Sequence, residues 1–317
     1  MFPLRGKLLV GLLLVVVCSS VMIAQAQYNS SPYLSPATVL LNYQKMVSSF
    51  KVFMYKPNKP QFKFATKVES LFYSSLQNST YLTQDPEEAH LFFVPFSHDI
   101  STRSLARVIT RVRTDLPYWN RTLGADHFFL ACAGIPHDSD RNLVELKKNA
   151  IQISCFPSRH DKFVPHKDVT LPPLPSPHAP ARRVRATVLV NDTEPSDRLV
   201  GASEFCMVEY ENDASWIGEA LRLGCVPVVV TEGAVNDMPF MDVLRWGEIA
   251  VFVRSGKGVK RVVGDMWREP HERMRRLGVV ASKHLLWNHP PLPFDAFNTI
   301  MYQLWLRRHT VRYSNVQ

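Results

Sequence analysis

The sequence predicts an α/β fold built on a largely parallel sheet, and three observations support this class. Apolar runs of strand length alternate with amphipathic helical segments between residues 50 and 171, an order typical of parallel sheets. The stretch 203–246 repeats this order as strand, loop, helix and strand, and its second strand is the unbroken apolar run Val226–Val230. Such a run is typical of a strand buried on both faces. The length of 317 residues leaves room for two domains, each with its own core.

Residues 1–26 have the pattern of a targeting segment. Arg5 and Lys7 precede a nearly uncharged apolar run over residues 8–24, which is at the short limit for crossing a bilayer. Ala24 and Ala26 then form a small-x-small cleavage pattern. We expect a retained signal-anchor, with a removed signal peptide as the alternative, and both lead into the secretory lumen. Sequons for N-glycosylation follow at Asn29, Asn78, Asn120 and Asn191.

The composition is that of a globular protein with an excess of basic residues. Apolar residues make up 46% and charged residues 21% of the chain, which excludes wholesale disorder. The net charge of +9 suits an anionic partner such as a nucleotide sugar, an acidic glycan or a membrane face. The basic residues are dispersed and the chain is expected to leave the cytosol, so we expect no nucleic acid partner.

Four cysteines are expected in the lumen, Cys132, Cys155, Cys206 and Cys225, and they allow three complete pairings. Cys132 and Cys155 each end a predicted strand and are the better candidates for a bridge. Cys225 begins the valine-rich run and is expected to be a packed free thiol. Cys18 lies in the apolar N-terminal run, and no CxxC or Cys/His ligand spacing is present.

Residues 46–171 are predicted to form the N-terminal domain, after a short stem over residues 27–45 that lies outside the core. Its strands are predicted from apolar runs and its helices from apolar residues at helical spacing. Asp85–Ala89 is expected to form a turn of helix, with proline first and acids following. The expected strands are Lys51–Tyr55, His90–Phe96, Asp126–Cys132, Ala150–Ser154 and Lys167–Leu171, and the expected helices are Phe64–Leu76 and Ser104–Leu116.

The proline-rich segment Pro172–Pro180 is the predicted linker, and with the short segment after it occupies residues 172–202. The C-terminal domain is expected over residues 203–309, with a tail at 310–317. Asp213 is a good N-cap for a helix of about three turns, and Gly224 has the position of a left-handed C-cap. The other expected elements are strands at Phe205–Val208 and Ile249–Val253 and helices at Gly258–Leu277 and Asp295–Arg308.

Five blocks of sequence, weak singly and highly specific together, resemble one enzyme family. They are Lys51–Tyr55, Asp85–Pro95, Pro117–Thr122 through Asp126–Phe129, Ser203–Cys206, and Glu219–Ala220 with Gly224–Val228 and Met238–Phe240. In their order and spacing the chain resembles the exostosin-type glycosyltransferases (glycosyltransferase family 47), in the single-domain form typical of plants and algae. The resemblance extends over residues 50–305.

This resemblance implies a GT-B-like fold, in which two Rossmann-like domains face a cleft. The N-terminal domain is then the acceptor side and the C-terminal domain the nucleotide-sugar side. It implies inverting transfer from a UDP-sugar to a polysaccharide or glycoprotein glycan, with no obligatory metal or other cofactor. It also implies a single-pass type II protein of the Golgi membrane, with other glycosyltransferases as partners.

The donor side is expected at the helix that carries Glu219. The resemblance assigns this carboxylate to the ribose or the donor hydroxyls, with Asp213, Ser215 and Arg222 as further donor-binding candidates. A helix N-terminus at the carboxyl edge of a sheet can hold an anionic group through its free amides. The alternative is a surface ion pair between Glu219 and Arg222 at i,i+3 spacing.

Two Asp/His pairs are candidates for the base that takes the proton of the acceptor hydroxyl. Asp126 and His127 open a predicted strand of the N-terminal domain, and His137 and Asp138 lie in the loop that leaves the same strand. A histidine suits this role because its reference pKa is about 6.5. The alternative for His127 is a structural hydrogen bond that caps the strand.

Three features depart from the family pattern. Residues 181–202 are much shorter than the corresponding segment of the family, so we expect an incomplete C-terminal domain with an exposed sheet edge. Trp216 stands where many members have arginine, and the loop Glu209–Asp213 introduces acids. Two other functions therefore stay open: a non-catalytic homologue that is a partner in a glycosyltransferase complex, and a secreted carbohydrate-binding protein.

Overall fold

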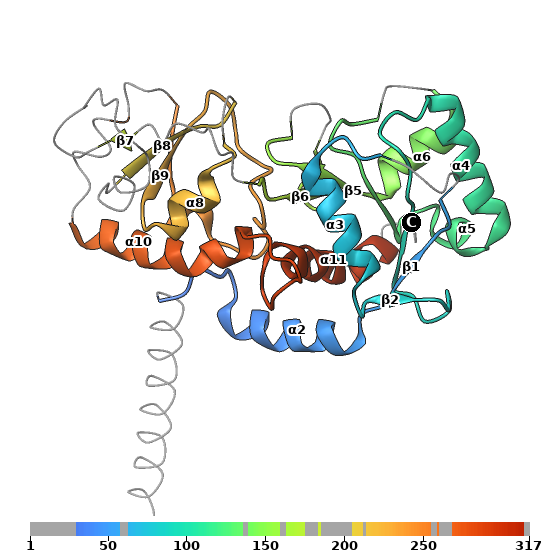
Figure 1. Ribbon diagram of the computed structural model, residues 1–317, viewed down its shortest axis with the longest axis horizontal. Coiled ribbons are helices and arrows are strands. Elements are labelled where there is room, and N and C mark those ends of the chain that lie inside the picture. Colours follow the sequence, from blue (N-terminus) through green and yellow to red (C-terminus); the bar gives the residue numbers. More distant parts are fainter. Residues whose placement is uncertain are drawn as a thin grey trace, which may run out of the picture.

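The computed structural model describes residues 30–57, 63–135, 139–158, 163–174, 183–184, 205–211, 214–254, 259 and 268–313. Figure 1 shows two sheets side by side, one built from β1 to β6 and the other containing β7 to β9. This arrangement confirms the predicted α/β class. The expected signal or anchor segment lies outside the described residues. Within the described ranges, no helix has both the length and the apolar character needed to cross a membrane.

The N-terminal sheet is entirely parallel, with the strand order β2-β1-β3-β4-β5-β6. Every residue of β3, β4 and β6 is buried, as expected when helices cover both faces of a parallel sheet. The strands are β1 (Val52–Met54), β2 (Leu82–Thr83), β3 (Leu91–Phe93), β4 (His127–Leu130), β5 (Ile151–Cys155) and β6 (Val169–Leu171).

Helices pack on both faces of this sheet. The start of one of them, α3, is fixed by a capping box in which Thr66 Oγ1 accepts from the Glu69 N–H and the Glu69 carboxylate accepts from the Thr66 N–H. α4, α5 and α6 share a hydrophobic cluster with one face, and α3 shares the larger cluster with the other. The helices are α3 (Lys67–Gln77), α4 (Thr102–Asp115), α5 (Tyr118–Thr122) and α6 (Arg141–Asn149).

The C-terminal sheet has the order β10-β9-β8-β7. β8, β9 and β10 are parallel, and β7 pairs antiparallel with β8. β7 belongs to the shortened segment and pairs with part of the edge that we expected to be exposed. The elements are β7 (Arg183–Val184), β8 (Phe205–Glu209), α8 (Ile217–Arg222), β9 (Val226–Val230), η1 (Trp246–Glu248), β10 (Val251–Val253), α10 (Arg268–Ser282) and η2 (Lys283–Leu285).

Helix α8 is shorter than the sequence predicts. It has six residues, and Trp216 takes the N-cap position without a side-chain capping bond; Asp213, the expected N-cap, lies outside the described residues. The Trp216 side chain is buried, so packing of its ring, and not capping propensity, determines where the helix begins. The predicted end is confirmed, because Gly224 follows the helix with a φ of +74°.

Two further expectations are wrong. The expected stem contains helix α2 (Pro36–Ser49), whose buried Val39, Tyr43 and Met46 recur at helical spacing and belong to the core. The segment Asp85–Ala89 forms turns in place of a helical turn. The Asp85 carboxylate accepts from the Glu87 N–H at 2.9 Å, a local bond that favours a turn over a helix.

The last helix, α11 (Ala296–Tyr313), packs against the N-terminal sheet. It contacts β6 and α2, and the Phe297 ring lies 5.6 Å from the Phe72 ring of α3. The sequence places this segment in the C-terminal domain. Its apolar face instead covers the lower side of the N-terminal sheet, so the chain crosses between the two sheets once more near its end (Figure 1).

Two disulfides are present among the described cysteines. The bridge Cys132–Cys155 confirms the prediction, with Cα atoms 4.8 Å apart at the ends of neighbouring strands. The expectation that Cys225 is a free thiol is wrong, because it is bonded to Cys206. Cys206 pairs in register with Pro227, so Cys225 lies two residues away on the same face of the sheet. The Cα separation of 5.8 Å is then suitable for a bridge.

Candidate functional site

Each sheet with its helices forms one lobe of the molecule. The carboxyl ends of the parallel strands in the two sheets meet where the two lobes join. Phe156, directly after β5, has its ring centroid 5.9 Å from that of Tyr210, directly after β8. Asp237, in the loop after β9, accepts hydrogen bonds from the Ser158 N–H at 2.6 Å and from the Tyr210 hydroxyl. Ligands of open parallel sheets bind beyond the carboxyl ends of the strands. The candidate site therefore lies around this junction.

Asp237 is the polar link of the junction. Its carboxylate is 1% exposed and receives one donor from each lobe. Burial, followed by the hydrogen bond to Asp237, raises the pKa of the Tyr210 hydroxyl, so Tyr210 stays protonated and remains a donor. This geometry holds the two carboxyl edges against each other.

On the C-terminal side, Glu219 lies in α8, the helix that follows β8. Its carboxylate accepts from Arg222 Nε at 2.7 Å and also from Arg222 Nη2. The two side chains are 34% and 48% exposed, so the pair is accessible to a ligand. The structure thus brings Glu219 and Arg222 together, as the ion-pair alternative predicts. Ser215 lies just before this helix, and Asp213 lies outside the described residues.

In the acidic loop after β8, the carboxylate of Glu211 lies at the end of β9. Glu211 accepts from the Thr231 hydroxyl at 2.9 Å and from the Glu232 N–H at 3.4 Å. Both donors follow the last residue of β9, at the carboxyl edge of the sheet. A negative charge therefore lies at the edge where a donor phosphate is expected.

Asp126 and His127 lie at the amino end of β4, and both are fully buried. His127 Nδ1 is 2.8 Å from Asp126 Oδ1, and His127 Nε2 is 3.0 Å from the Tyr55 hydroxyl. Thr122 Oγ1 and Arg121 Nη2 also donate to the Asp126 carboxylate, at 2.6 and 2.9 Å. The pair is at the opposite edge from the junction, so the structure does not place it on the acceptor side. This geometry supports the structural alternative.

The charge state of this pair is consistent with a structural role. Hydrogen bonds from His127, Thr122 and Arg121 outweigh the opposing effect of burial and lower the pKa of Asp126 to about 2. Burial lowers the pKa of His127, which keeps its ring neutral. The other predicted pair, His137 and Asp138, lies outside the described residues.

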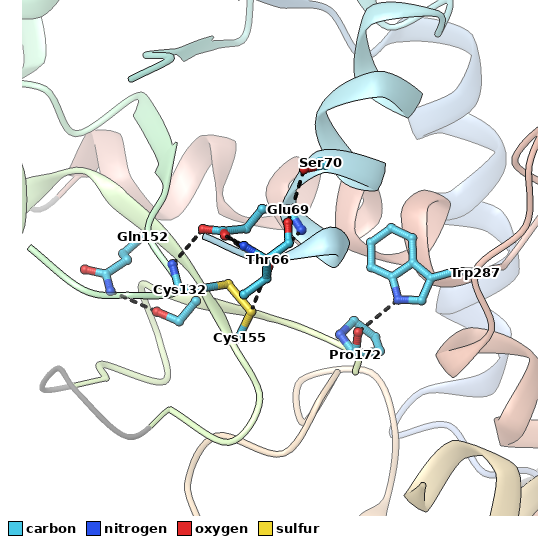
Figure 2. Close-up of a disulfide and its surroundings, with 9 residues drawn as sticks. Thr66, Glu69, Ser70, Cys132, Gln152, Cys155, Pro172 and Trp287 are labelled. Atoms are coloured by element: carbon cyan, nitrogen blue, oxygen red, sulfur yellow. Dashed lines mark hydrogen bonds between the residues drawn. A yellow bond between two sulfur atoms is a disulfide. The ribbon is translucent and has the colours of Figure 1, made fainter. Parts of the chain in front are cut away.

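Sequence reasoning missed Glu69, which lies at the carboxyl edge of the N-terminal sheet. Figure 2 shows it beside the disulfide Cys132–Cys155. Besides the capping box, its Oε1 accepts from the Cys132 N–H at 2.8 Å, so this buried carboxylate joins α3 to the end of β4. The pattern Thr-x-x-Glu at Thr66 signals the capping box but gives no sign of the contact with Cys132.

His98 was also missed, and it shares a small pocket with Glu69. The pocket lies past the ends of β3 and β4, with Phe96 and Gly134 among its lining residues. His98 Nδ1 is 3.0 Å from the Lys63 carbonyl oxygen. A carbonyl can only accept, so Nδ1 carries the proton and Nε2 presents a lone pair. The position of His98 after the apolar strand His90–Phe96 is the sequence signal that points to this edge.

No metal centre is visible in the part of the chain that the structure covers, since no group of three or more His, Cys, Asp or Glu side chains there is placed to hold an ion.

Comparisons with known proteins agree with the geometry. A family model, the Exostosin GT47 domain, matches residues 46–196. A probable glycosyltransferase of Arabidopsis thaliana is 28% identical, in an alignment that covers 87% of this chain and 65% of the relative. A probable β-1,4-xylosyltransferase of Arabidopsis thaliana is 25% identical over 80% of this chain and 81% of its own length. A probable glucuronosyltransferase of Oryza sativa subsp. japonica is 27% identical, with 79% and 78% covered.

The mixed α/β architecture with two parallel sheets is that of a GT-B-like glycosyltransferase. The motifs and the comparisons support an exostosin-type glycosyltransferase of family 47. The alignment with the first relative extends over 340 positions, more than the 317 residues of this chain. That relative therefore has residues within the aligned region that this chain lacks, and this chain spans just under two thirds of its length.

Proposed function

We propose that this protein transfers a sugar from a UDP-sugar to a hydroxyl of a polysaccharide or glycoprotein glycan, with inversion. The observation that supports this best is the meeting of two carboxyl edges at Asp237. One edge continues into α8 with Glu219, and the other carries the pocket of His98. A donor and an acceptor held on opposite edges are then brought close enough to react.

In this proposal His98 is the base. Its Nε2 takes the proton of the acceptor hydroxyl while the hydroxyl oxygen forms a bond to the anomeric carbon. The bond from that carbon to the diphosphate oxygen breaks, and UDP leaves with the electron pair. Glu219 holds the donor's hydroxyls, and Arg222 supplies positive charge for the diphosphate.

The proposal includes the cellular context. We place the transfer in the Golgi lumen, with residues 8–24 as a type II anchor and without a required metal ion. The apolar N-terminal run and the four sequons support this context. Mass spectrometry of the mature N-terminus distinguishes the anchor from secretion after Ala26, and transfer that persists in EDTA is the expected result for a metal-independent reaction.

A non-catalytic homologue is the second candidate function. It is favoured by Glu211, whose carboxylate lies where a phosphate is expected. It is also favoured by Trp216, which stands where many members of the family have an arginine. A protein of this kind keeps the fold and serves as a partner in a glycosyltransferase complex.

Calorimetry of UDP binding to the full-length protein tests the first candidate against the second. Glu219→Ala is expected to weaken binding by about tenfold or more, because a charge-assisted hydrogen bond to the ligand is lost. Glu272→Ala removes an exposed acid of α10 and is the matched control, with unchanged binding. If UDP fails to bind at millimolar concentration, or binds equally well to both variants, the assignment of the donor site is wrong and the second candidate is favoured.

A further inference from the structure

The helix α4 carries a row of arginines on its solvent face. Arg103, Arg107 and Arg111 are spaced by four residues, so they lie one above the other along the helix. All three are exposed, whereas Leu105, Ile109 and others on the opposite face are buried in the core. The row therefore presents a line of positive charge to solvent.

The three arginines differ in how far the protein neutralises their charge, because Arg111 has partners within the chain. Arg103 and Arg107 have no ion-pair partner within the described residues. Arg111 Nε is 3.6 Å from Asp115 Oδ2, and both side chains are more than half exposed. An exposed ion pair of this kind contributes little to stability, so it can exchange for a ligand carboxylate at low cost. The exposed guanidinium groups of the row are therefore available to an anionic ligand, and they are not part of the hydrophobic core.

The row ends at a pocket between α4 and the end of β1. Its volume is about 260 Å³, against about 30 Å³ for a water molecule in the liquid. Apolar surface comes from Phe53, Pro95 and Leu116. The charged lining residues are Lys56, Arg111 and Asp115, so two cations and one acid face the pocket, and the acid is the ion-pair partner of Arg111. Aromatic and apolar walls with a few charged groups at the rim are typical of a small-ligand site.

We propose that this pocket and the arginine row bind a glycan that carries uronic acid residues. The inference rests on the proposed function, since the glycan is the polysaccharide acceptor held away from the reaction centre. One sugar ring packs its C–H face on Phe53 and Pro95, and its carboxylate pairs with Arg111 or Lys56. Further carboxylates along the chain pair with Arg107 and Arg103, because the planar guanidinium matches a carboxylate in a two-bond geometry.

An anionic polymer fits these observations better than a membrane surface. Lipid headgroups attract dispersed basic charge without the need for a pocket, whereas here the charge is in line and ends at an apolar cavity. A linear chain of sugar rings can fill both features at once.

Affinity electrophoresis or calorimetry with polygalacturonate tests the proposal on the full-length protein. The double variant R107E/R111E is expected to weaken binding by at least about tenfold, because two attractions become repulsions. The matched control is R276E, which makes the same charge change at an exposed arginine of α10 in the other lobe. It is expected to bind as the wild type does. Fully methyl-esterified polygalacturonate keeps the sugar but loses the charge, and is expected to bind weakly to all variants.

Three results overturn the proposal. Equal losses in R107E/R111E and R276E mean general charge attraction, and equal binding of the methyl ester means that carboxylates are not recognised. Stronger binding to phosphatidylserine vesicles than to polygalacturonate, lost in R107E/R111E, means a membrane contact. Circular dichroism of each variant shows that the fold is kept. UDP binding is measured in parallel, so a failure of the donor site is seen separately from a failure of the glycan site.

Discussion

At the scale of single residues, the acids at the carboxyl edges differ from the one histidine that we assign as base. Glu69 and Asp237 are each 1% exposed and accept hydrogen bonds that join separate segments. Removing either carboxylate leaves donors of two separate segments without their partner, which costs stability. His98 is exposed, and of its ring it is Nδ1 that bonds to the fold, at the same Lys63 carbonyl oxygen that accepts from its backbone N–H. Its Nε2 can therefore face a ligand. This difference separates a binding or catalytic group from a structural one.

Replacement of His98 tests its role. His98→Ala is expected to lower kcat by about 10²-fold or more, with KM little changed, because general base catalysis acts in the transition state. His166→Ala, an exposed histidine before β6, is the matched control. An unchanged kcat in His98→Ala assigns the proton transfer to another group.

At the scale of elements, a histidine joins the N-terminal segment to the last two helices. His284 in η2 is 1% exposed, with Nε2 at 2.9 Å from the Tyr33 hydroxyl and Nδ1 at 2.8 Å from Thr299 Oγ1 of α11. Tyr43 of α2 stacks on Phe294 with ring centroids 3.8 Å apart. The segment that begins the described chain is thus bonded to the segment that ends it.

This contact predicts a loss of stability in acid. Burial, with a smaller contribution from the Lys283 charge, lowers the pKa of His284 to about 3, whereas its unfolded value is about 6.5. Between these values the unfolded state binds a proton that the folded state does not. The free energy of unfolding therefore falls as the pH falls, by up to about 1.4 kcal/mol per pH unit from this group. The lowered pKa of His127 acts in the same direction.

Urea titrations at several pH values measure the slope of the free energy of unfolding against pH. His284→Asn is expected to make the slope shallower between about pH 6 and pH 4, because the group that titrates is removed. His289→Asn changes an exposed histidine near α11 and is expected to leave the slope as in the wild type. An unchanged slope in His284→Asn contradicts the assignment, whatever the overall stability of the variant.

At the scale of the whole molecule, one arginine of α11 joins three parts of the chain. Arg307 is 5% exposed, and its Nη1 donates to Asp242 Oδ2 at 2.7 Å on the C-terminal side. Its Nε and Nη2 donate to the Lys167 and Asp168 carbonyl oxygens, both at 2.9 Å, before β6 of the N-terminal sheet. Together with Asp237, this guanidinium fixes how the two lobes meet.

Removal of this group is expected to be costly. Arg307→Ala removes the side-chain donor of the buried Asp168 carbonyl oxygen and of the part-buried Lys167 carbonyl oxygen, and it leaves Asp242 with Gln303 as a donor. We therefore expect a loss of about 3 kcal/mol in the free energy of unfolding. Arg308→Ala is the matched control, because Arg308 lies over the Trp305 ring at 3.6 Å and its loss costs about 1 kcal/mol. Chemical denaturation followed by tryptophan fluorescence measures both. Equal losses contradict the special role of Arg307.

The sequence by itself determined the local elements and the resemblance to a glycosyltransferase family. Apolar periodicity predicts β1, β3, β4, β5 and α4 correctly, because burial of a face depends on residues that are close along the chain. The bridge Cys132–Cys155 was predictable since both cysteines end strands of one sheet. The motifs show the resemblance to exostosin-type glycosyltransferases without the structure.

Only the tertiary structure decided which segments meet. The structure places Asp126 and His127 at the amino edge of the sheet, pairs Cys206 with Cys225, and packs α11 on the N-terminal sheet. It also brings His98 and Glu69 to one pocket. Each of these facts depends on contacts between residues far apart along the chain, which the spacing of residues within one segment does not encode.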